Sequence, residues 1–288
     1  MVGNNLQPTY KRQRFLLAFI HQLNGGVTST ELQKLIFLYT MKENSEFYDF
    51  IPYKFGSYSF QLAEDVNILC RDGYLSTEGS RIQAIGDYPQ RDLFPIETKR
   101  GDNLIRKAYR EYPYFAINSE ITNTLFYGTE AEQFKQNKQN YVQTDQVLFT
   151  IGYEGKSIEA FINSLIQNDV RLLCDVRKNP ISRKFGFSKI KLKHILEVIG
   201  IKYVHIPELG IESDKRRSLK TLDDYQCLFR EYEKTLSNLK PQLRQLYSLL
   251  YSNVRIALMC YEKESIMCHR HVIRDYLANM YKLKSKDL

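Results

Sequence analysis

The sequence has no tryptophan, few cysteines and no long uninterrupted apolar run. None of its apolar stretches approaches the roughly 20 residues that cross a membrane as a helix. The first fourteen residues, MVGNNLQPTYKRQR, lack the apolar core of a secretory signal peptide. We therefore expect a cytoplasmic protein with no membrane contact.

The chain has five cysteines, an odd number, and their spacing is irregular. A disulfide framework usually needs an even number of cysteines in a secreted context, so this pattern argues against one and favours a reducing compartment. The cysteines are Cys70, Cys174, Cys227, Cys260 and Cys268.

Basic residues outnumber acidic ones, 41 against 33, which gives a net charge of +8. Such an excess favours polyanionic partners, here a nucleotide or a nucleic acid, although many basic proteins bind neither. With 288 residues, 43% of them hydrophobic, the chain is long enough for two domains.

Residues 1–90 carry helical periodicity followed by a hairpin pattern. A first helical stretch covers residues 14–20, and Thr28 and Glu31 form a capping-box signature before a second, apolar one. A third amphipathic stretch covers residues 60–70, and residues 74–82 are predicted to form two short strands around a turn. Three helices and a two-stranded wing predict a winged-helix-like module.

Three runs in this module, residues 32–38, 53–59 and 69–75, resemble in order those of the SocA-like antitoxin (Panacea) group. Ser57 stands where that pattern usually has proline. Members of the group often bind proteins, so the resemblance implies a protein partner or self-association, and a role in prokaryotic defence. Residues 32–38 are also too apolar for a helix that reads a DNA groove.

Residues 91–145 are polar and rich in Asn and Gln, and we interpret them as a partly helical connector. Residues 146–288 then alternate apolar runs with amphipathic helices, which predicts an α/β fold with a mostly parallel, Rossmann-like sheet covered by helices. The expected strands are 147–153, 171–177, 202–207 and 254–260, and the expected helices are 157–168, 189–199, 222–251 and one from His269.

Polar residues follow each expected strand. Parallel strands deliver their carboxyl ends to one edge of the sheet, so these residues should meet in space. The candidate binding residues are Gly152, Tyr153, Glu154, Gly155, Lys156, Arg177, Ser182, His205, Cys260 and Arg270, and the candidate catalytic residues are Asp175, Glu262, Cys268 and His269.

Two of these groups have a functional and a structural interpretation. Residues 152–156 either cradle an anion with backbone amides or form only a tight turn before a capped helix. Asp175 and Arg177 lie on the same side of a strand. Either Asp175 is a general base or metal ligand and Arg177 binds an anion, or the two residues form a local ion pair. The basic loop 178–189, which contains Ser182, combines cations with two phenylalanines. It is either a solvated surface loop or, as we prefer, a segment suited to phosphate contacts and base stacking.

The segment from Cys260 to Arg270 has the strongest chemical character. Cys268 beside His269 and Arg270 at a helix start should have a lowered pKa and act as a nucleophile. Plain packing, a redox-sensing disulfide and zinc ligation by Cys260, Cys268 and His269 are the alternatives, and zinc is a weak match because no CxxC motif is present. We expect Arg270 to bind an anionic substrate. The sequence names no metal or cofactor.

The motifs at residues 150–157, 175–182, 200–210 and 260–270 resemble, in order, those of the prokaryotic domain-of-unknown-function 488 family. The resemblance implies a compact α/β domain with its marked residues at one sheet edge, and no settled reaction. Our leading hypothesis is an enzyme acting on a nucleotide or nucleic acid. The alternatives are a winged-helix DNA-binding regulator that senses a small anion or redox state, and an antitoxin-like protein-interaction module.

Overall fold

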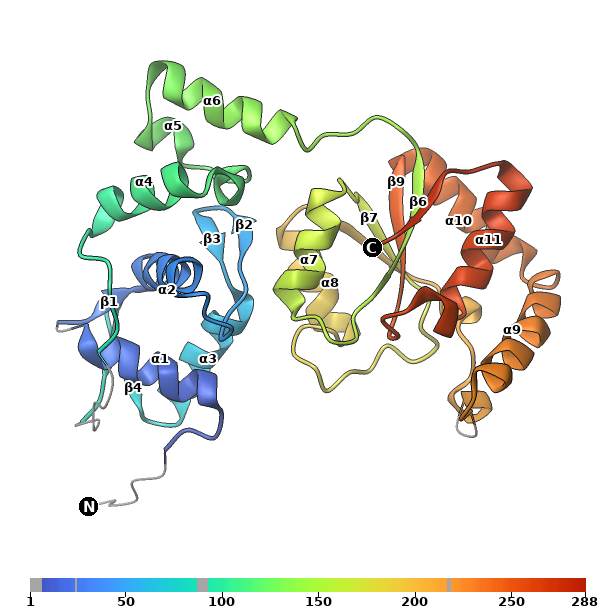
Figure 1. Cartoon of the computed structure of the whole chain (residues 1–288), viewed down its shortest axis with the longest axis horizontal. Helices are drawn as coiled ribbons and strands as arrows, with labels where there is room; N and C mark the ends of the chain where they lie inside the picture. The colour runs from blue at the N-terminus through green and yellow to red at the C-terminus, as the bar shows by residue number, and fades with distance from the viewer. Residues whose placement is uncertain (1–6, 24, 87–92, 217–218) are drawn as a thin grey trace. The chain divides into compact units, whose positions relative to one another are not determined.

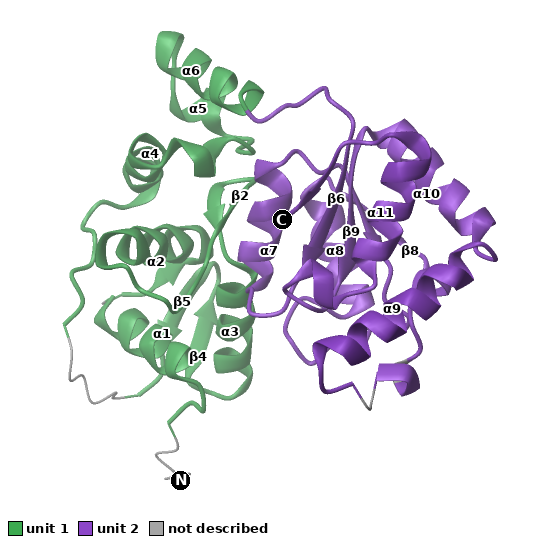
Figure 2. Ribbon diagram, turned by 45° about the vertical axis from the view of Figure 1, so that its right-hand side comes forward, with its two compact units in different colours: residues 1–140 green, residues 141–288 purple. Residues whose placement is uncertain are grey.

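The computed structural model describes residues 7–23, 25–86, 93–216 and 219–288. The chain divides into two compact units, residues 1–140 and residues 141–288 (Figure 2). The domain boundary expected at residue 90 and the first six residues lie outside the described part of the chain. No helix in these ranges is long and apolar enough to span a membrane.

The first unit contains six α-helices, a short 3-10 helix and five short strands among its described residues. They are α1 (Lys11–Gln22), β1 (Val27–Thr28), α2 (Ser29–Glu43), β2 (Ile51–Tyr53), β3 (Gly56–Tyr58), α3 (Phe60–Arg71), β4 (Leu75–Glu78), β5 (Arg81–Ala84), α4 (Gly101–Glu111), η1 (Pro113–Ala116), α5 (Thr122–Leu125) and α6 (Gly128–Gln139).

Helix α2 is the central helix of this unit. The Thr28 side chain accepts a hydrogen bond from the Glu31 amide, and the Glu31 side chain accepts one from the Thr28 amide, so the predicted capping box is confirmed. Every residue from Leu32 to Leu38 is buried. Strands β1, β5 and β4 form an antiparallel sheet in that order, and β2 pairs with β3 in a separate hairpin.

The segment that the sequence indicated as a polar connector contributes to the core of the first unit. Its buried side chains belong to the same hydrophobic cluster as Phe19 of α1 and Leu35 of α2. The polar residues that dominate its composition lie on the outer sides of α4 and α6. The buried residues of the segment are Leu104, Ile105, Ala108, Tyr109, Ala116, Leu125, Phe126, Ala131 and Phe134.

The second unit alternates strands and helices, as the sequence predicts. Its elements are β6 (Val147–Gly152), α7 (Ile158–Gln167), β7 (Leu172–Asp175), α8 (Lys189–Val198), β8 (Lys202–His205), η2 (Pro207–Leu209), η3 (Ser213–Arg216), α9 (Leu222–Leu236), α10 (Lys240–Asn253), β9 (Arg255–Cys260), η4 (Ser265–Met267), α11 (Arg270–Tyr281) and β10 (Ser285–Asp287).

The five strands of this unit form one all-parallel sheet in the order β10-β6-β9-β7-β8. Helices α7 and α8 cover one face, and α9, α10 and α11 lie on the other (Figure 1). The prediction of a parallel sheet covered by helices is confirmed. Strand β10 was not predicted, because Ser285–Asp287 is short, polar and exposed and so lacks the apolar pattern of a strand.

The single helix predicted over residues 222–251 is wrong, since two helices, α9 and α10, occupy this stretch. The chain turns between them at Ser237–Leu239, and Pro241 lies in the first turn of α10, where a missing backbone amide costs no helical hydrogen bond. Leu236 and Leu243, on either side of the turn, both enter the core that the sheet shares with α11.

Candidate functional site

The strand ends of the second unit lie side by side at one edge of the sheet. Gly152 of β6 is in register with Cys260 of β9, and Asp175 of β7 is in register with His205 of β8 and with Met259 of β9. Residues separated by more than a hundred positions along the chain are therefore neighbours, as expected for parallel strands.

A cluster of two thiols and an imidazole occupies the end of β9 and the start of α11. Cys260, Cys268 and His269 are all buried. The Nδ1 atom of His269 lies 3.8 Å from Sγ of Cys260 and 3.7 Å from Sγ of Cys268. We refer to these three side chains as the Cys–His cluster.

The backbone directly after β7 sets the orientation of the His269 ring. Its Nε2 atom lies 3.1 Å from the carbonyl oxygen of Val176, which can only accept a hydrogen bond, so Nε2 carries the proton. Nδ1 accepts a hydrogen bond of 2.7 Å from Arg216, which can only donate, so Nδ1 is the unprotonated ring nitrogen.

Arg216 and Glu262 lie directly beside the cluster. Arg216 forms an ion pair of 2.7 Å with Oε1 of Glu262, and Oε2 of Glu262 lies 3.3 Å from Sγ of Cys260. Sequence reasoning missed Arg216, because it belongs to an irregular loop between β8 and α9 that carries no strand-end pattern. The only sequence feature that could have indicated Arg216 was a cation in the long segment that follows the carboxyl end of β8.

The two thiols of the cluster have opposite electrostatic environments. A hydrogen bond from Cys268 lowers the pKa of Cys260 well below its usual value, and the charge of Arg216 lowers it further against the effect of burial. Burial raises the pKa of Cys268, and the neighbouring charge of Cys260 adds to that effect. The lowered pKa therefore belongs to Cys260 and not to Cys268, where the sequence analysis expected it.

The pKa of Glu262 is raised, so this carboxyl retains its proton to a higher pH than an ordinary glutamate. Burial raises its pKa, and the charge of Cys260 raises it further, while Arg216 opposes both effects. Sγ of Cys260, with a lowered pKa, and Oε2 of Glu262, with a raised pKa, lie 3.3 Å apart. Pairs of titratable groups shifted in opposite directions are typical of acid–base sites.

Asp175 and Arg177 form a buried bidentate ion pair, with Nε–Oδ1 and Nη2–Oδ2 distances of 2.8 and 2.6 Å. Asp175 also accepts from the Tyr203 hydroxyl at 2.7 Å, and Arg177 donates to the Tyr153 hydroxyl and to the carbonyl of Phe187. Most hydrogen-bonding positions of both groups are used within the protein. This geometry favours the ion-pair interpretation and a positioning role for both residues.

Arg270 is almost fully buried and donates to protein atoms. Its guanidinium contacts the carbonyl oxygens of Glu262 and Lys263 at 2.5 and 2.9 Å and the hydroxyl of Thr150 at 3.3 Å. It therefore holds the loop that carries Glu262. A Cβ at Gly152 would lie 1.8 Å from the Glu262 carbonyl oxygen, so this loop requires glycine at the end of β6.

A cavity of about 360 Å³ opens above the Cys–His cluster. Several candidate residues meet there from β6, β7 and β9, together with cations from the loops after β7 and β8. The lining residues are Tyr153, Arg177, Lys178, Asn179, Ile181, Ser182, Arg183, Ile211, Arg216, Cys260, Tyr261 and His269.

The remaining candidates support the rim and do not line this cavity. Glu154 accepts from the Lys263 amide at 3.0 Å, and Lys156 donates to the carbonyl of Leu288 at 3.3 Å. Gly155 has a φ of +74° in the turn before α7. His205 contacts the Arg177 carbonyl at 2.9 Å through Nε2 and Lys189 at 3.1 Å through Nδ1.

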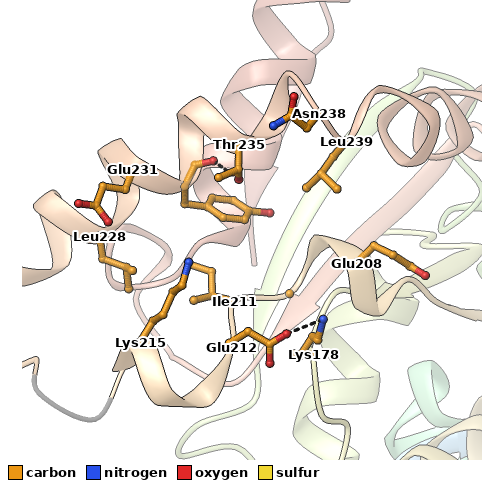
Figure 3. Close-up of a pocket in the computed structure, with 12 residues that line it drawn as sticks. Lys178, Glu208, Ile211, Glu212, Lys215, Leu228, Glu231, Thr235, Asn238 and Leu239 are labelled. Carbon is orange, nitrogen blue, oxygen red and sulfur yellow. Dashed lines mark hydrogen bonds and ion pairs between the residues drawn. The ribbon is translucent and has the colours of Figure 1, made fainter.

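A second cavity of about 390 Å³ lies between α9 and the loop after β8 (Figure 3). Lys178 and Glu212 form an ion pair of 2.7 Å at its mouth. Tyr232, which also lines it, donates to the carbonyl of Leu209 and packs edge-on against His269. No sequence pattern predicted this cavity, since its walls come from a helix and an irregular loop.

No curated protein and no solved structure matches the chain. The resemblance of residues 32–75 to the SocA-like antitoxin group has no counterpart in these comparisons and stays a prediction. Residues 157–277 match the family model described as "Domain of unknown function DUF488", so most of the α/β unit is similar to that family.

Proposed function

We propose that the second unit is an enzyme that acts on a nucleotide or a nucleic acid in the cavity above the Cys–His cluster. The observation that carries this proposal is the combination of titratable groups shifted in opposite directions, Cys260 and Glu262, with a cavity walled by cations. Packing alone does not require such a set at the carboxyl edge of a parallel sheet.

Cations on the cavity wall supply the contacts for phosphate. Arg183 is exposed and has no ion-pair partner among the described residues, while Lys178 and Arg216 each pair with one glutamate. Tyr261 is 47% exposed and lines the same cavity, so its ring is available for stacking on a base. We assign phosphate binding to Arg183 and base stacking to Tyr261.

Glu262 is the group that we assign to proton transfer, because its raised pKa lets it carry a proton nearer neutral pH than an ordinary carboxyl. Arg270 and Gly152 act through it, since they hold its backbone in place. Asp175 and Arg177 act on the opposite wall, where Arg177 orients Tyr153 and holds the end of the basic loop through the Phe187 carbonyl.

The test uses the full-length protein with two sets of probes, the four ribonucleoside 5′-monophosphates and a single-stranded DNA oligonucleotide. We expect binding that weakens with salt, and turnover detected as new products by chromatography. Glu262→Gln should abolish turnover and retain binding. Absence of binding to every probe at low salt would contradict the proposal.

Arg183→Ala should weaken binding of these probes by about tenfold, which corresponds to the loss of one charge-assisted contact of ~1.4 kcal/mol. Arg244→Ala is the matched control, because Arg244 is an exposed arginine on α10 that does not line the cavity. Equal losses in the two variants would indicate nonspecific attraction to a basic protein.

For the first unit we propose a winged-helix-like module. Its support is the succession α1, β1, α2, α3, β4 and β5, with the last strand placed between the other two in the antiparallel sheet. The β2–β3 hairpin is an insertion between α2 and α3. Because α2 is buried along residues 32–38, it has no polar face for a DNA groove, and we propose protein binding for this module.

A further inference from the structure

We propose that Cys260, Cys268 and His269 bind a zinc ion. One ligand atom from each of these buried residues lies within 4.8 Å of the other two. A tetrahedral zinc with Zn–S of ~2.3 Å and Zn–N of ~2.0 Å places sulfur and nitrogen ligands about 3.6 Å apart. The observed Sγ–Nδ1 distances of 3.8 and 3.7 Å come within a few tenths of an ångström of that value.

The surroundings of His269 suit a metal ligand. Its Nε2 proton is donated to the Val176 carbonyl, which leaves Nδ1, 3.8 and 3.7 Å from the two sulfurs, as the ligand atom. Metal-binding histidines characteristically donate their second ring nitrogen in this way, because the bond sets both tautomer and ring orientation. Two soft thiolates and one imidazole form a donor set that zinc prefers over magnesium or calcium.

The ligands come from regular elements and so are held rigidly. Cys260 is the last residue of β9, and Cys268 and His269 directly precede α11. This explains why the sequence has no CxxC knuckle: a strand end and a helix start supply the ligands instead. Two thiolates also balance the charge of Zn²⁺, and the Arg216–Glu262 pair beside them is neutral as a whole.

Arg216 marks the side on which a fourth ligand would bind. It donates to Nδ1 of His269 at 2.7 Å and lines the cavity. Since Nδ1 has a single lone pair in the ring plane, Arg216 must give up this hydrogen bond when the metal binds, and it can keep its bond to Glu262. Three protein ligands with a fourth position facing a cavity are typical of catalytic zinc, which activates a bound water.

The assignment of zinc does not depend on the proposed function. It replaces the nucleophile that the sequence suggested at Cys268, because Cys260 and Cys268 both become ligands. Glu262, whose Oε2 lies 3.3 Å from Sγ of Cys260, lies directly beside this site.

The test measures the metal directly. The reduced full-length protein is incubated with zinc, freed of excess metal by gel filtration and analysed by elemental mass spectrometry. We expect about one zinc per chain. Cobalt substitution should give intense sulfur-to-cobalt charge-transfer absorption, which reports thiolate ligation without any activity measurement.

Cys268→Ser and His269→Ala should each weaken zinc binding by at least about 100-fold in competition with a chromogenic chelator, because loss of a ligand exceeds the loss of an outer-shell partner. Cys227→Ser is the matched control, since this exposed cysteine on α9 lies outside the cluster. Glu262→Gln should retain zinc. Circular dichroism establishes that each variant is folded.

Two results overturn the zinc site: folded wild-type protein that holds no zinc and gives no charge-transfer band, or a Cys227→Ser variant that loses zinc as fully as Cys268→Ser. These outcomes are distinct from those of the proposed function. Zinc binding without nucleotide or DNA binding supports the site and rejects the function, whereas turnover by a zinc-free protein supports the function and rejects the site.

Discussion

At the scale of single residues, the two arginines expected to bind an anionic substrate are used within the protein. Arg177 is bound by Asp175, and Arg270 by two backbone carbonyls. A buried guanidinium needs most of its donors satisfied, so neither is well placed to bind a ligand strongly as well. We therefore assign anion binding to the exposed Arg183 instead.

Gly152→Ala tests the close approach between β6 and the loop of Glu262. The added methyl would lie 1.8 Å from a backbone oxygen, so the loop must move. We expect a loss of more than about 3 kcal/mol in the free energy of unfolding, at the upper end of overpacking costs. Denaturant titration measures it.

Gly155→Ala is the control for this substitution. Its Cβ would meet nothing within 4 Å, although the φ of +74° is strained for alanine. We expect a cost of only about 1–2 kcal/mol from that strain. If the two alanine variants were equally stable, the close approach at Gly152 would not constrain the loop.

Lys34 predicts a pH dependence of stability. It is buried, donates to the Ser57 carbonyl at 2.7 Å, and burial lowers its pKa from 10.5 to about 7. Between these values the unfolded chain binds the proton more strongly than the folded one, so stability rises with pH by up to ~1.4 kcal/mol per unit. Below about pH 7 Lys34 is protonated in both the folded and the unfolded chain, so it no longer makes the free energy of unfolding depend on pH.

Lys34→Met removes that titration and retains an unbranched side chain of similar length. We expect the unfolding free energy of the wild type to rise relative to that of the variant as the pH rises from 7 to 9. Denaturant titrations at three pH values measure it. A constant difference would show that Lys34 titrates normally in the folded protein.

At the scale of elements, the local sequence predicts where a helix begins more reliably than it predicts where the helix ends. The capping boxes at Thr28 and Thr221 occur where α2 and α9 begin. The turn between α9 and α10 was missed because the apolar spacing continues across it. Leu236 and Leu243 face the same core, so periodicity alone does not reveal the interruption.

Thr28→Ala should destabilise the protein by about 1 kcal/mol, because the Glu31 amide loses its acceptor and α2 is the central helix of its unit. Thermal unfolding measures this loss. Thr129→Ala is the control, since Thr129 is an exposed residue in the first turn of α6 whose side chain is not a cap. Equal shifts in melting temperature would contradict the role of the cap.

Asp287 is the residue that fixes β10 beside β6. Its carboxylate accepts hydrogen bonds from Thr150, Ser265 and Arg274 at 2.5, 2.7 and 2.6 Å. Asp287→Ala should cost about 2–3 kcal/mol of unfolding free energy, since three donors lose their acceptor. Hydrogen exchange should show faster opening of β6, and unchanged exchange there would contradict this role of Asp287.

At the scale of the whole molecule, each unit has a hydrophobic cluster of its own. A sheet of five strands covered on both faces is a complete folding unit. We therefore expect residues 141–288, expressed alone, to unfold cooperatively and to retain the zinc stoichiometry of the full chain. An unfolded or molten fragment by near-ultraviolet circular dichroism would contradict this expectation.

The sequence by itself determined the parallel sheet and the set of residues at its carboxyl edge. Alternation of apolar runs with amphipathic helices is a local property, and parallel strands necessarily end together. It also determined the capping box of α2, because Thr28 and Glu31 interact within one turn.

Only the tertiary structure decided which partner each polar group takes. Arg216 reaches the Cys–His cluster from a loop, the low pKa belongs to Cys260 and not to Cys268, and Arg270 binds a loop backbone. These outcomes depend on burial and on the direction of side chains from distant segments. Neither quantity is encoded in the periodicity of a single segment, because both arise only when the segments pack together.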